Sequence, residues 1–355
     1  MNITIARLPG DGIGPEVTEA ASSILNRVAD QFGHKITWLN ADIGGAAIDQ
    51  SGTPLPDSTL RICKESDAIL LGAIGGPAWA NHPQGLRPEQ GLLDLRSNLG
   101  LFANLRPIPA HPQLASLSPL KADRMQGVDL LIVRELTGGI YFGRRSSCDD
   151  SAMDECAYSK HEIQRVARVA FDAARQRNSA VCSVDKANVL ATSRLWRRTV
   201  QHIHETEYPD VNLEHQLVDA MAMHLITRPG DFDVVLTENM FGDILSDEAS
   251  VLAGSLGVLP SASLGATGPG LFEPCHGSAP DIAGKGIANP IAAILSAAML
   301  MRNGLKLENE ADAIEVAVEN TIQNHIVTPD LGGTATTRQC TEHIAKRLTH
   351  DYVTQ

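Results

Sequence analysis

Short apolar segments alternate along the chain with longer segments in which apolar residues recur at helical spacing. The short segments are bounded by turn residues and predict strands at 2–7, 36–39, 68–72, 128–133, 213–218 and 232–237. The longer segments predict helices at 17–32, 56–65, 161–177, 194–207, 291–302, 308–324 and 336–348. This alternation predicts an α/β fold with a large sheet flanked by helices.

The segment 238–257 changes to helical periodicity directly after the predicted strand at 232–237. The apolar residues at this spacing are Phe241, Ile244, Leu245 and Leu252. Asp243 and Asp247 lie four residues apart, so a helix would place both carboxylates on one face. Like charges at this spacing weaken a helix by a few tenths of a kcal/mol, about 0.2–0.5, and a divalent cation would offset the repulsion. Spacing alone leaves a solvated acidic face as the simpler interpretation.

Several connecting segments have distinctive compositions. Segment 75–91 is rich in Gly, Pro and Asn and predicts a long loop. Segment 137–143, which contains Tyr141, predicts a strand or hairpin, and the polar segment 146–155 predicts a mobile loop. Segment 278–290 predicts a Gly/Pro-rich loop before an apolar helix, whose N-terminus could bind phosphates through backbone N–H groups.

Three glycines, Gly10, Gly12 and Gly14, follow the first predicted strand. The third comes one place too early for the dinucleotide fingerprint G-x-G-x-x-G, and no clear acidic strand end follows about 20 residues later. A tight turn from strand to helix, with Pro15 in the first helical turn, explains the pattern at least as well.

The length of 355 residues suggests two domains, or one large α/β unit with a subdivided core. The chain is 43% hydrophobic but only 4% aromatic, so its core must be mostly aliphatic. A net charge of −13 opposes binding to nucleic acid or an anionic membrane, and an anionic substrate would need a local basic pocket. Six cysteines without C-x-x-C spacing, no secretory n-region and no membrane-length apolar run predict a reduced, soluble, cytoplasmic protein.

Arg96 and Arg106 lie in the apolar segment 92–107, and a third arginine, Arg134, ends the predicted strand at 128–133. Arginine binds carboxylates through a bidentate fork, so three convergent arginines would suit a substrate with more than one carboxylate. Taken singly, each is more often a surface or ion-pair residue. Lys186 follows another strand, at the end where α/β active sites gather. Asp219 comes directly after the strand at 213–218.

The chain resembles the isocitrate/isopropylmalate dehydrogenase family of β-decarboxylating dehydrogenases from residue 3 to about 345. The segments that carry the resemblance are LPGDGIGPE (8–16), LLDLRSNLGLFANLRP (92–107), TGGIYFG (137–143), VDKANVL (184–190), ENMFGDILSDEAS (238–250) and HGSAPDIAGKGIANP (276–290). The resemblance implies a two-domain fold with a large mixed sheet, distinct from the Rossmann fold. It also implies a discontinuous cofactor-binding domain at 1–99 plus 252–355. Residues 100–251 would form the domain for substrate, metal and dimerisation, with an arm near 137–160.

The resemblance also implies roles for individual residues. Lys186 would take part in deprotonating the substrate hydroxyl, and Tyr141 would donate a proton after decarboxylation. Asp219, Asp243 and Asp247 would bind Mg²⁺ or Mn²⁺, and Asp219 would also contact the substrate. The three arginines would hold malate-type carboxylates. Lys186 and Asp219 would reach the site of the neighbouring subunit, so that the active sites of a homodimer are shared.

The implied cofactor is NAD, bound outside the usual nucleotide fold. The expected cofactor-binding residues are Glu89, Asn188, His276, Gly277, Ser278, Ala279, Pro280, Asp281, Ile282 and Asn289. NADP-using relatives usually carry a cation at the position of Asp281. A carboxylate there would bind the ribose 2′-hydroxyl and repel a 2′-phosphate, which favours NAD.

Leu92, Leu93 and Val189 match the side-chain pocket of the family, and an apolar wall suits an isopropyl group. The expected reaction is therefore NAD-dependent oxidative decarboxylation of (2R,3S)-3-isopropylmalate to 4-methyl-2-oxopentanoate and CO₂, in leucine biosynthesis. D-malate, tartrate, isocitrate and homoisocitrate are the alternative substrates, and a non-catalytic regulatory subunit is the alternative of another class. Ala220, where the family usually has asparagine, and the unusual segment 144–160 bear on the substrate preference.

Overall fold

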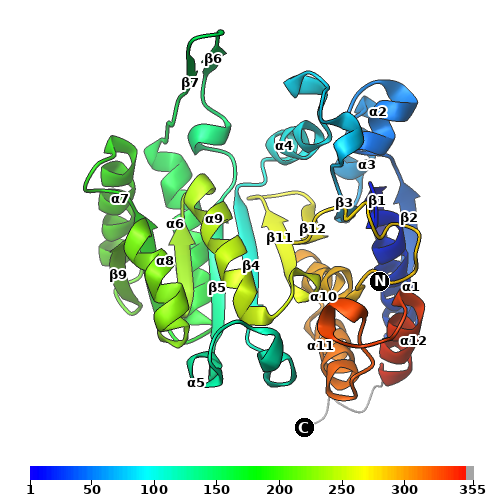
Figure 1. Cartoon of the computed structure of the whole chain (residues 1–355). Coiled ribbons are helices and arrows are strands. Elements are labelled where there is room, and N and C mark those ends of the chain that lie inside the picture. Colours follow the sequence, from blue (N-terminus) through cyan, green and yellow to red (C-terminus); the bar gives the residue numbers. More distant parts are fainter. Residues whose placement is uncertain (349–355) are drawn as a thin grey trace. The chain divides into compact units, whose positions relative to one another are not determined.

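The computed structural model describes residues 1–348, which divide into two compact units. Unit 1 comprises Met1–Leu99 and the chain from Ser255 onward, and unit 2 is Gly100–Gly254. Each unit contains five strands of mixed sheet, with helices packed against them (Figure 1). The predicted α/β class with a mixed sheet is therefore confirmed.

In unit 1 the strand order is β2-β1-β3-β12-β11. All neighbours run parallel except β11 and β12, which are antiparallel. The strands are β1 (Asn2–Gly10), β2 (Lys35–Asn40), β3 (Ala68–Ala73), β11 (Pro260–Leu264) and β12 (Gly270–Pro274). Every residue of β3 is buried, as expected for a strand inside a sheet that helices cover.

The helices of unit 1 include one that follows the predicted cofactor loop and one that carries the predicted substrate residue Arg96. They are α1 (Gly14–Gln31), α2 (Gly45–Ser51), α3 (Asp57–Glu65), α4 (Pro88–Leu99), α10 (Ile291–Met299), α11 (Glu308–Gln323) and α12 (Thr337–Arg347). Helices α1 and α10 pack on the strands, and α11 and α12 pack on those two helices. Helix α10 is almost entirely buried and continues into a π turn at Leu300–Gly304, so its α-helical part ends earlier than predicted.

In unit 2 the order is β4-β5-β10-β8-β9, with only β4 and β5 antiparallel. The strands are β4 (Ala103–Pro109), β5 (Asp129–Glu135), β8 (Ala180–Asp185), β9 (Asn212–Leu217) and β10 (Val234–Thr237). The helices are α5 (Ala122–Met125), α6 (Lys160–Arg175), α7 (Ala191–Glu207), α8 (Val218–Thr227) and α9 (Asn239–Ser250). Helices α6 and α7 pack together against the strands, and α8 and α9 form a second pair (Figure 1).

Three predictions for connecting segments were wrong. The expected loop at 75–91 ends at Pro88, where α4 begins. Segment 137–143 contains a single 3-10 turn, Gly139–Tyr141, instead of a strand or hairpin. The expected mobile loop at 146–155 is an antiparallel hairpin of β6 (Arg145–Ser147) and β7 (Ala152–Asp154), which extends away from the rest of its unit (Figure 1).

The glycine-rich segment after β1 is a tight turn, as predicted. Gly10 and Gly12 have φ angles of 69° and 58°, which favour glycine. A Cβ on Gly12 would lie 2.0 Å from the carbonyl oxygen of Ser278. The backbone N–H of Ile13 donates to the same oxygen at 2.8 Å, so the turn holds the predicted cofactor loop in place.

Candidate active site

Helix α9 positions the central carboxylates of unit 2. It begins immediately after β10, and Phe241 and Leu245 anchor it in the core. Asp243 and Asp247 lie one turn apart, and their side chains are 35% and 68% exposed. Ile244 has the predicted helical spacing but is 60% exposed, so it lies outside the core.

Arg134 on β5 lies against this helix. Its guanidinium forms an ion pair with Asp243 and donates to Asn239 Oδ1 from Nε at 3.2 Å and from Nη2 at 2.8 Å. Gly242 allows the close approach, because a Cβ there would lie 2.6 Å from Arg134 Cγ. The first turn of α9 therefore holds both the stem and the head of Arg134.

Arg106 on β4 reaches the same helix one turn further along. Its Nη1 donates to Ser246 Oγ at 2.7 Å and lies 3.4 Å from Asp247 Oδ1, and its Nη2 lies 3.8 Å from Asp243 Oδ1. Burial alone would raise the pKa of Asp243, but the charges of Arg134 and Arg106 outweigh it, so this pKa lies below its usual 3.8. The structure thus brings together two of the three predicted arginines and two of the three predicted metal ligands.

Tyr141 completes this group. Its hydroxyl donates to Asp243 Oδ2 at 2.9 Å, and its ring centroid lies 5.8 Å from Arg134 Cζ. Burial, and then the negative charge of Asp243, raises the pKa of Tyr141, so the phenol carries its proton at neutral pH. The turn that carries Tyr141 is held by the buried carboxylate of Glu135, which accepts from the backbone N–H groups of Thr137 and Gly138.

Lys186 and Asp219 form a separate pair in unit 2. Lys186 follows β8, and its Nζ donates to Asp219 Oδ1 in the first turn of α8. The hydrogen bond from Lys186 holds the pKa of Asp219 below its usual value. Among residues 1–348, no three His, Cys, Asp or Glu side chains gather as a metal site. Within one chain, the three aspartates therefore do not form the cluster expected of metal ligands.

Two carboxylates on one helix face nevertheless fit a hard divalent cation. Mg²⁺ prefers oxygen ligands, takes few protein carboxylates and retains several waters. Asp243 and Asp247 could hold such a cation once a third carboxylate approaches from outside the chain. The metal ligands remain a prediction.

The third arginine, Arg96, lies on α4 in unit 1. It is 8% exposed, and its Nη2 donates to Glu273 Oε1 on β12 at 2.8 Å. Leu92 and Leu93 lie half-buried on the same helix, and Glu89 lies exposed in its first turn. Val189 belongs to unit 2 and is 62% exposed, and the neighbouring Asn188 is also exposed.

The predicted cofactor residues from His276 to Asn289 form an irregular segment before α10. Its end is anchored where Asn289 Nδ2 donates to Asp330 Oδ2 at 2.9 Å. Nε2 of His276 is buried and lacks a hydrogen-bond partner within the described chain, which a bound ligand could supply. Asp281 is exposed, so its carboxylate is accessible to a ribose. These features fit a dinucleotide on this segment.

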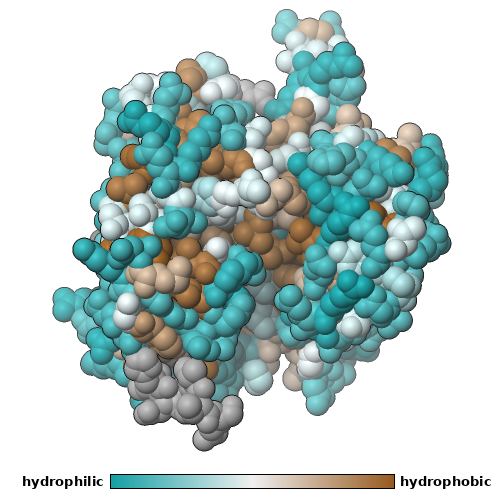
Figure 2. All heavy atoms as spheres, turned by 180° about the vertical axis from the view of Figure 1, so that it is seen from behind, coloured by the Kyte–Doolittle hydropathy of each residue, from teal (hydrophilic) through white to brown (hydrophobic). Residues whose placement is uncertain are grey.

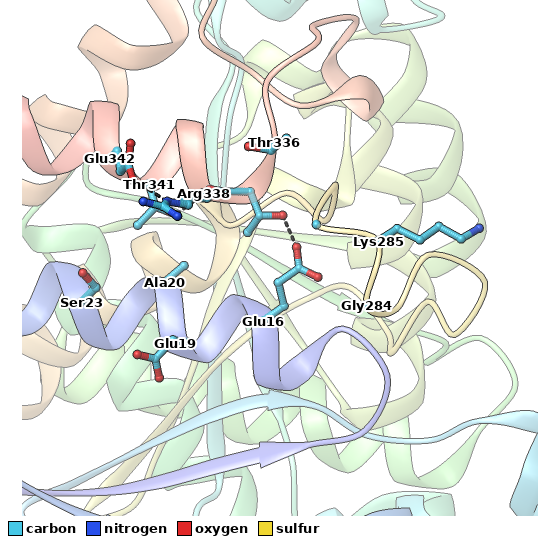
Figure 3. Close-up of a pocket in the computed structure, with 12 residues that line it drawn as sticks. Glu16, Glu19, Ala20, Ser23, Gly284, Lys285, Thr336, Arg338, Thr341 and Glu342 are labelled. Carbon is cyan, nitrogen blue, oxygen red and sulfur yellow. Dashed lines mark hydrogen bonds and ion pairs between the residues drawn. The ribbon is translucent and has the colours of Figure 1, made fainter.

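A separate pocket of unit 1 does not fit an acidic substrate. It has a volume of about 690 Å³ and lies between α1, the loop at 284–286 and the start of α12 (Figure 3). Glu16, Glu19 and Glu342 line it, and Arg338 there is already paired with Glu342. Figure 3 also shows Lys285 extending away from Glu16. Repulsion by these carboxylates disfavours a dicarboxylate.

Comparison with known proteins decides the family. A profile of the isocitrate/isopropylmalate dehydrogenase family matches residues 4–346. The chain belongs to this family. It is 56% identical to a 3-isopropylmalate dehydrogenase of Geobacillus kaustophilus, with 99% of this chain and 96% of that one covered. It is also 60% identical to a 3-isopropylmalate dehydrogenase of Bacillus caldotenax, with 87% of this chain and 85% of that one covered.

Solved structures of the family have the same fold. An isocitrate dehydrogenase from Methylococcus capsulatus is 36% identical, with a TM-score of 0.87 and 98% of this chain and 99% of that one covered. A β-decarboxylating dehydrogenase from Thermococcus kodakarensis is 38% identical, with a TM-score of 0.81 and 98% and 96% covered. The resemblance and the fold class predicted from the sequence are both confirmed.

Sequence reasoning missed the residues that hold the predicted ones in place. Asn239 binds Arg134, Ser246 and Asn104 bind Arg106, and Glu273 binds Arg96. Asn239 carried a usable signal, because it precedes Asp243 by one helical turn and therefore shares its face. Glu273 carried none, because it lies 177 residues from Arg96.

Proposed function

We propose that the chain is an enzyme that oxidatively decarboxylates (2R,3S)-3-isopropylmalate to 4-methyl-2-oxopentanoate and CO₂ in leucine biosynthesis. It uses NAD and Mg²⁺ or Mn²⁺. The observation that carries the proposal is a cluster around α9, which we call the α9 group. It consists of Arg106, Arg134, Tyr141, Asp243 and Asp247. Relatives that are 54–60% identical to this chain are named 3-isopropylmalate dehydrogenase, which supports the choice of substrate.

In this proposal, Arg106 and Arg134 bind the substrate carboxylates beside Asp243. Bound Mg²⁺ or Mn²⁺ would polarise the substrate hydroxyl and stabilise the charge left by loss of CO₂, while NAD would accept the hydride. Lys186 takes the hydroxyl proton, and Tyr141 gives its proton to the carbon that has lost CO₂. The raised pKa of Tyr141 keeps that proton available at neutral pH.

A homodimer is part of the proposal. Lys186 and Asp219 pair with each other, and Lys186 is half-buried while Asp219 is exposed. The pair is therefore accessible to a second copy of the chain. Exposed apolar side chains lie on the same pair of helices, with Met223 and Ile226 on α8 and Ile244 on α9. The side of unit 2 that carries α6 is by contrast mostly hydrophilic (Figure 2). An apolar face of this kind favours contact with a second copy, which would supply Lys186 and Asp219 to the α9 group.

No described helix is both long enough and apolar enough to span a bilayer. The six cysteines, all within residues 1–348, form no disulfide with one another, which favours the reducing cytoplasm as the location. An isocitrate-type activity is the second candidate, because the Methylococcus capsulatus structure carries that name at 36% identity. Leu92 and Leu93 oppose it, since neither can hydrogen-bond a third carboxylate.

The test is the rate of NADH formation with Mn²⁺ and each of 3-isopropylmalate, D-isocitrate and D-malate. We expect kcat/KM to be highest for 3-isopropylmalate. A higher value for D-isocitrate would establish the second candidate. Failure to turn over any of them, in a protein that binds both NAD and Mn²⁺, would favour a regulatory subunit.

A further inference from the structure

Asn239 lies at the junction of three parts of the α9 group. It is the first residue of α9 and is 1% exposed. Its backbone N–H donates to the Tyr158 hydroxyl at 2.9 Å, and its Nδ2 donates to the Gly138 carbonyl at 3.2 Å. Its Oδ1 accepts two hydrogen bonds from Arg134, at 2.8 and 3.2 Å. One buried amide thus joins β5 to the turn that carries Tyr141.

These contacts fix the orientation of the Arg134 guanidinium. A guanidinium is planar, so two donors held by one oxygen set its direction as well as its position. Nη1 of the same guanidinium also forms an ion pair with Asp243. The stem of Arg134 already lies close against Gly242, because a Cβ there would lie 2.6 Å from Arg134 Cγ and 2.9 Å from Arg134 Cβ.

The same amide acts on Tyr141 from two sides. The bond to the Gly138 carbonyl holds the residue that precedes the 3-10 turn Gly139–Tyr141. The guanidinium that Oδ1 orients lies 5.8 Å from the Tyr141 ring. A displacement of Asn239 would therefore move the arginine and the tyrosine together.

We propose that Asn239 is a positioning residue, whose side-chain amide sets the orientation in which Arg134 receives a substrate carboxylate. This inference rests on the proposed function, because it takes a dicarboxylate as the ligand of Arg134. Binding then requires no further ordering of the arginine, and this ordering is the cost that preorganised sites avoid.

The experiment is a double-mutant cycle in the full-length protein, with Asn239→Ala, Arg134→Lys and the double variant. The substrate is the dicarboxylate that the wild-type protein turns over fastest. Loss of two hydrogen bonds to a charged group should raise KM about 10- to 100-fold in the wild-type background. In the Arg134→Lys background the same change should raise KM less than about 3-fold, because lysine cannot use the amide as a planar fork does. The Kd for NAD should stay unchanged in all variants.

Tyr158→Phe is the matched control. It removes the hydrogen bond to the Asn239 backbone but leaves the amide and Arg134 untouched. We expect it to lower the denaturation midpoint without raising KM. Asn239→Ser is the second variant if Asn239→Ala does not fold, because serine keeps a polar group at this buried position but its single hydroxyl cannot span two guanidinium nitrogens.

An equal rise of KM in both backgrounds would overturn the proposal, since Asn239 would then act independently of Arg134. A comparable rise in Tyr158→Phe would overturn it too, by assigning the effect to the start of α9. An unchanged KM in Asn239→Ala would do the same. If the wild-type protein turned over no dicarboxylate, the proposed function itself would fail, and this result is separate from the other three.

Discussion

Replacement of Gly242 by alanine tests how tightly α9 lies on Arg134. The new Cβ would lie 2.2 Å from Thr237 Oγ1, 2.6 Å from Arg134 Cγ and 2.9 Å from Arg134 Cβ. Neither neighbour can easily retreat. Thr237 is fully buried in β10, and the head of Arg134 is bound to Asn239 and Asp243. The helix must therefore move outward, away from Arg134.

Two opposing terms decide the stability of Gly242→Ala. Alanine gains about 1 kcal/mol over glycine inside a helix. Overpacking a core costs about 1–3 kcal/mol, and three contacts this short belong at the upper end of that range. We expect a net loss of about 1–2 kcal/mol in the free energy of unfolding.

The effect on activity should be larger than the effect on stability. Displacing a substrate-binding group by about 1 Å can lower the rate about 100-fold. We therefore expect kcat/KM to fall about 10- to 100-fold, which corresponds to about 1.4–2.7 kcal/mol in the activation free energy. Denaturant titration and steady-state kinetics measure the two quantities on the same preparation.

Gly230→Ala is the control for this experiment, because a Cβ at Gly230 would lie 3.5 Å from its nearest neighbour, the Gln126 carbonyl oxygen. This variant should leave both the stability and kcat/KM nearly unchanged. A Gly242→Ala protein that is more stable than the wild type and equally active would refute the reasoning. It would mean that α9 does not depend on close contact with Arg134.

Three further predictions concern single side chains. Tyr141→Phe should lower kcat about 10²- to 10⁴-fold with an unchanged Kd for NAD, and a near-native kcat would remove this tyrosine from the proton transfer. Asp281→Lys should weaken NAD binding and improve the use of NADP, whereas an unchanged ratio of kcat/KM for the two cofactors would place this carboxylate away from the ribose. Burial, followed by the charges of Glu135 and Asp185, raises the pKa of Glu238 from its usual 4.5 to about 7. Between these two values the folded state holds a proton that the unfolded state releases, so stability should fall as pH rises through this interval. Glu238→Gln should remove on the order of 2–3 kcal/mol of this pH dependence, measured by urea denaturation at pH 5 and pH 8, and an unchanged slope would contradict the assignment.

The sequence predicts the buried strands and the long helices well, because their periodicity reflects burial directly. Strand β3 is apolar throughout and buried throughout. The shared face of Asp243 and Asp247 also follows from helix geometry alone, and the structure places both beside Arg106.

The hairpin of β6 and β7 could not be predicted by the same argument. All six of its strand residues are exposed, so no alternation of burial marks the strands. The turn at Tyr141 depends on Glu135, whose carboxylate folds the chain back through bonds to Thr137 and Gly138. Ile244 departs from the core pattern because it faces outward on α9, and a second copy of the chain would explain its apolar character.

The convergence of side chains was beyond sequence reasoning for a different reason. Arg106 and Ser246 are separated by 140 residues, and Arg134 and Asn239 by 105. Only the packing of α9 across the ends of β4, β5 and β10 brings them together. The role of Asn239 is therefore a product of tertiary structure, although the residue lies within a segment that carried the family resemblance.

The most direct test of the central claim is a parallel measurement of kcat/KM for 3-isopropylmalate, D-malate, D-isocitrate and tartrate, with NAD and Mn²⁺ or Mg²⁺. We expect the highest value for 3-isopropylmalate. The proposed apolar contacts with Leu92 and Leu93 would favour the isopropyl group over hydrogen by about 1–3 kcal/mol, or about 10- to 200-fold. A higher value for D-malate or tartrate would show that 3-isopropylmalate is not the preferred substrate. It would assign the specificity to other residues, such as Ala220 or those of the hairpin formed by β6 and β7.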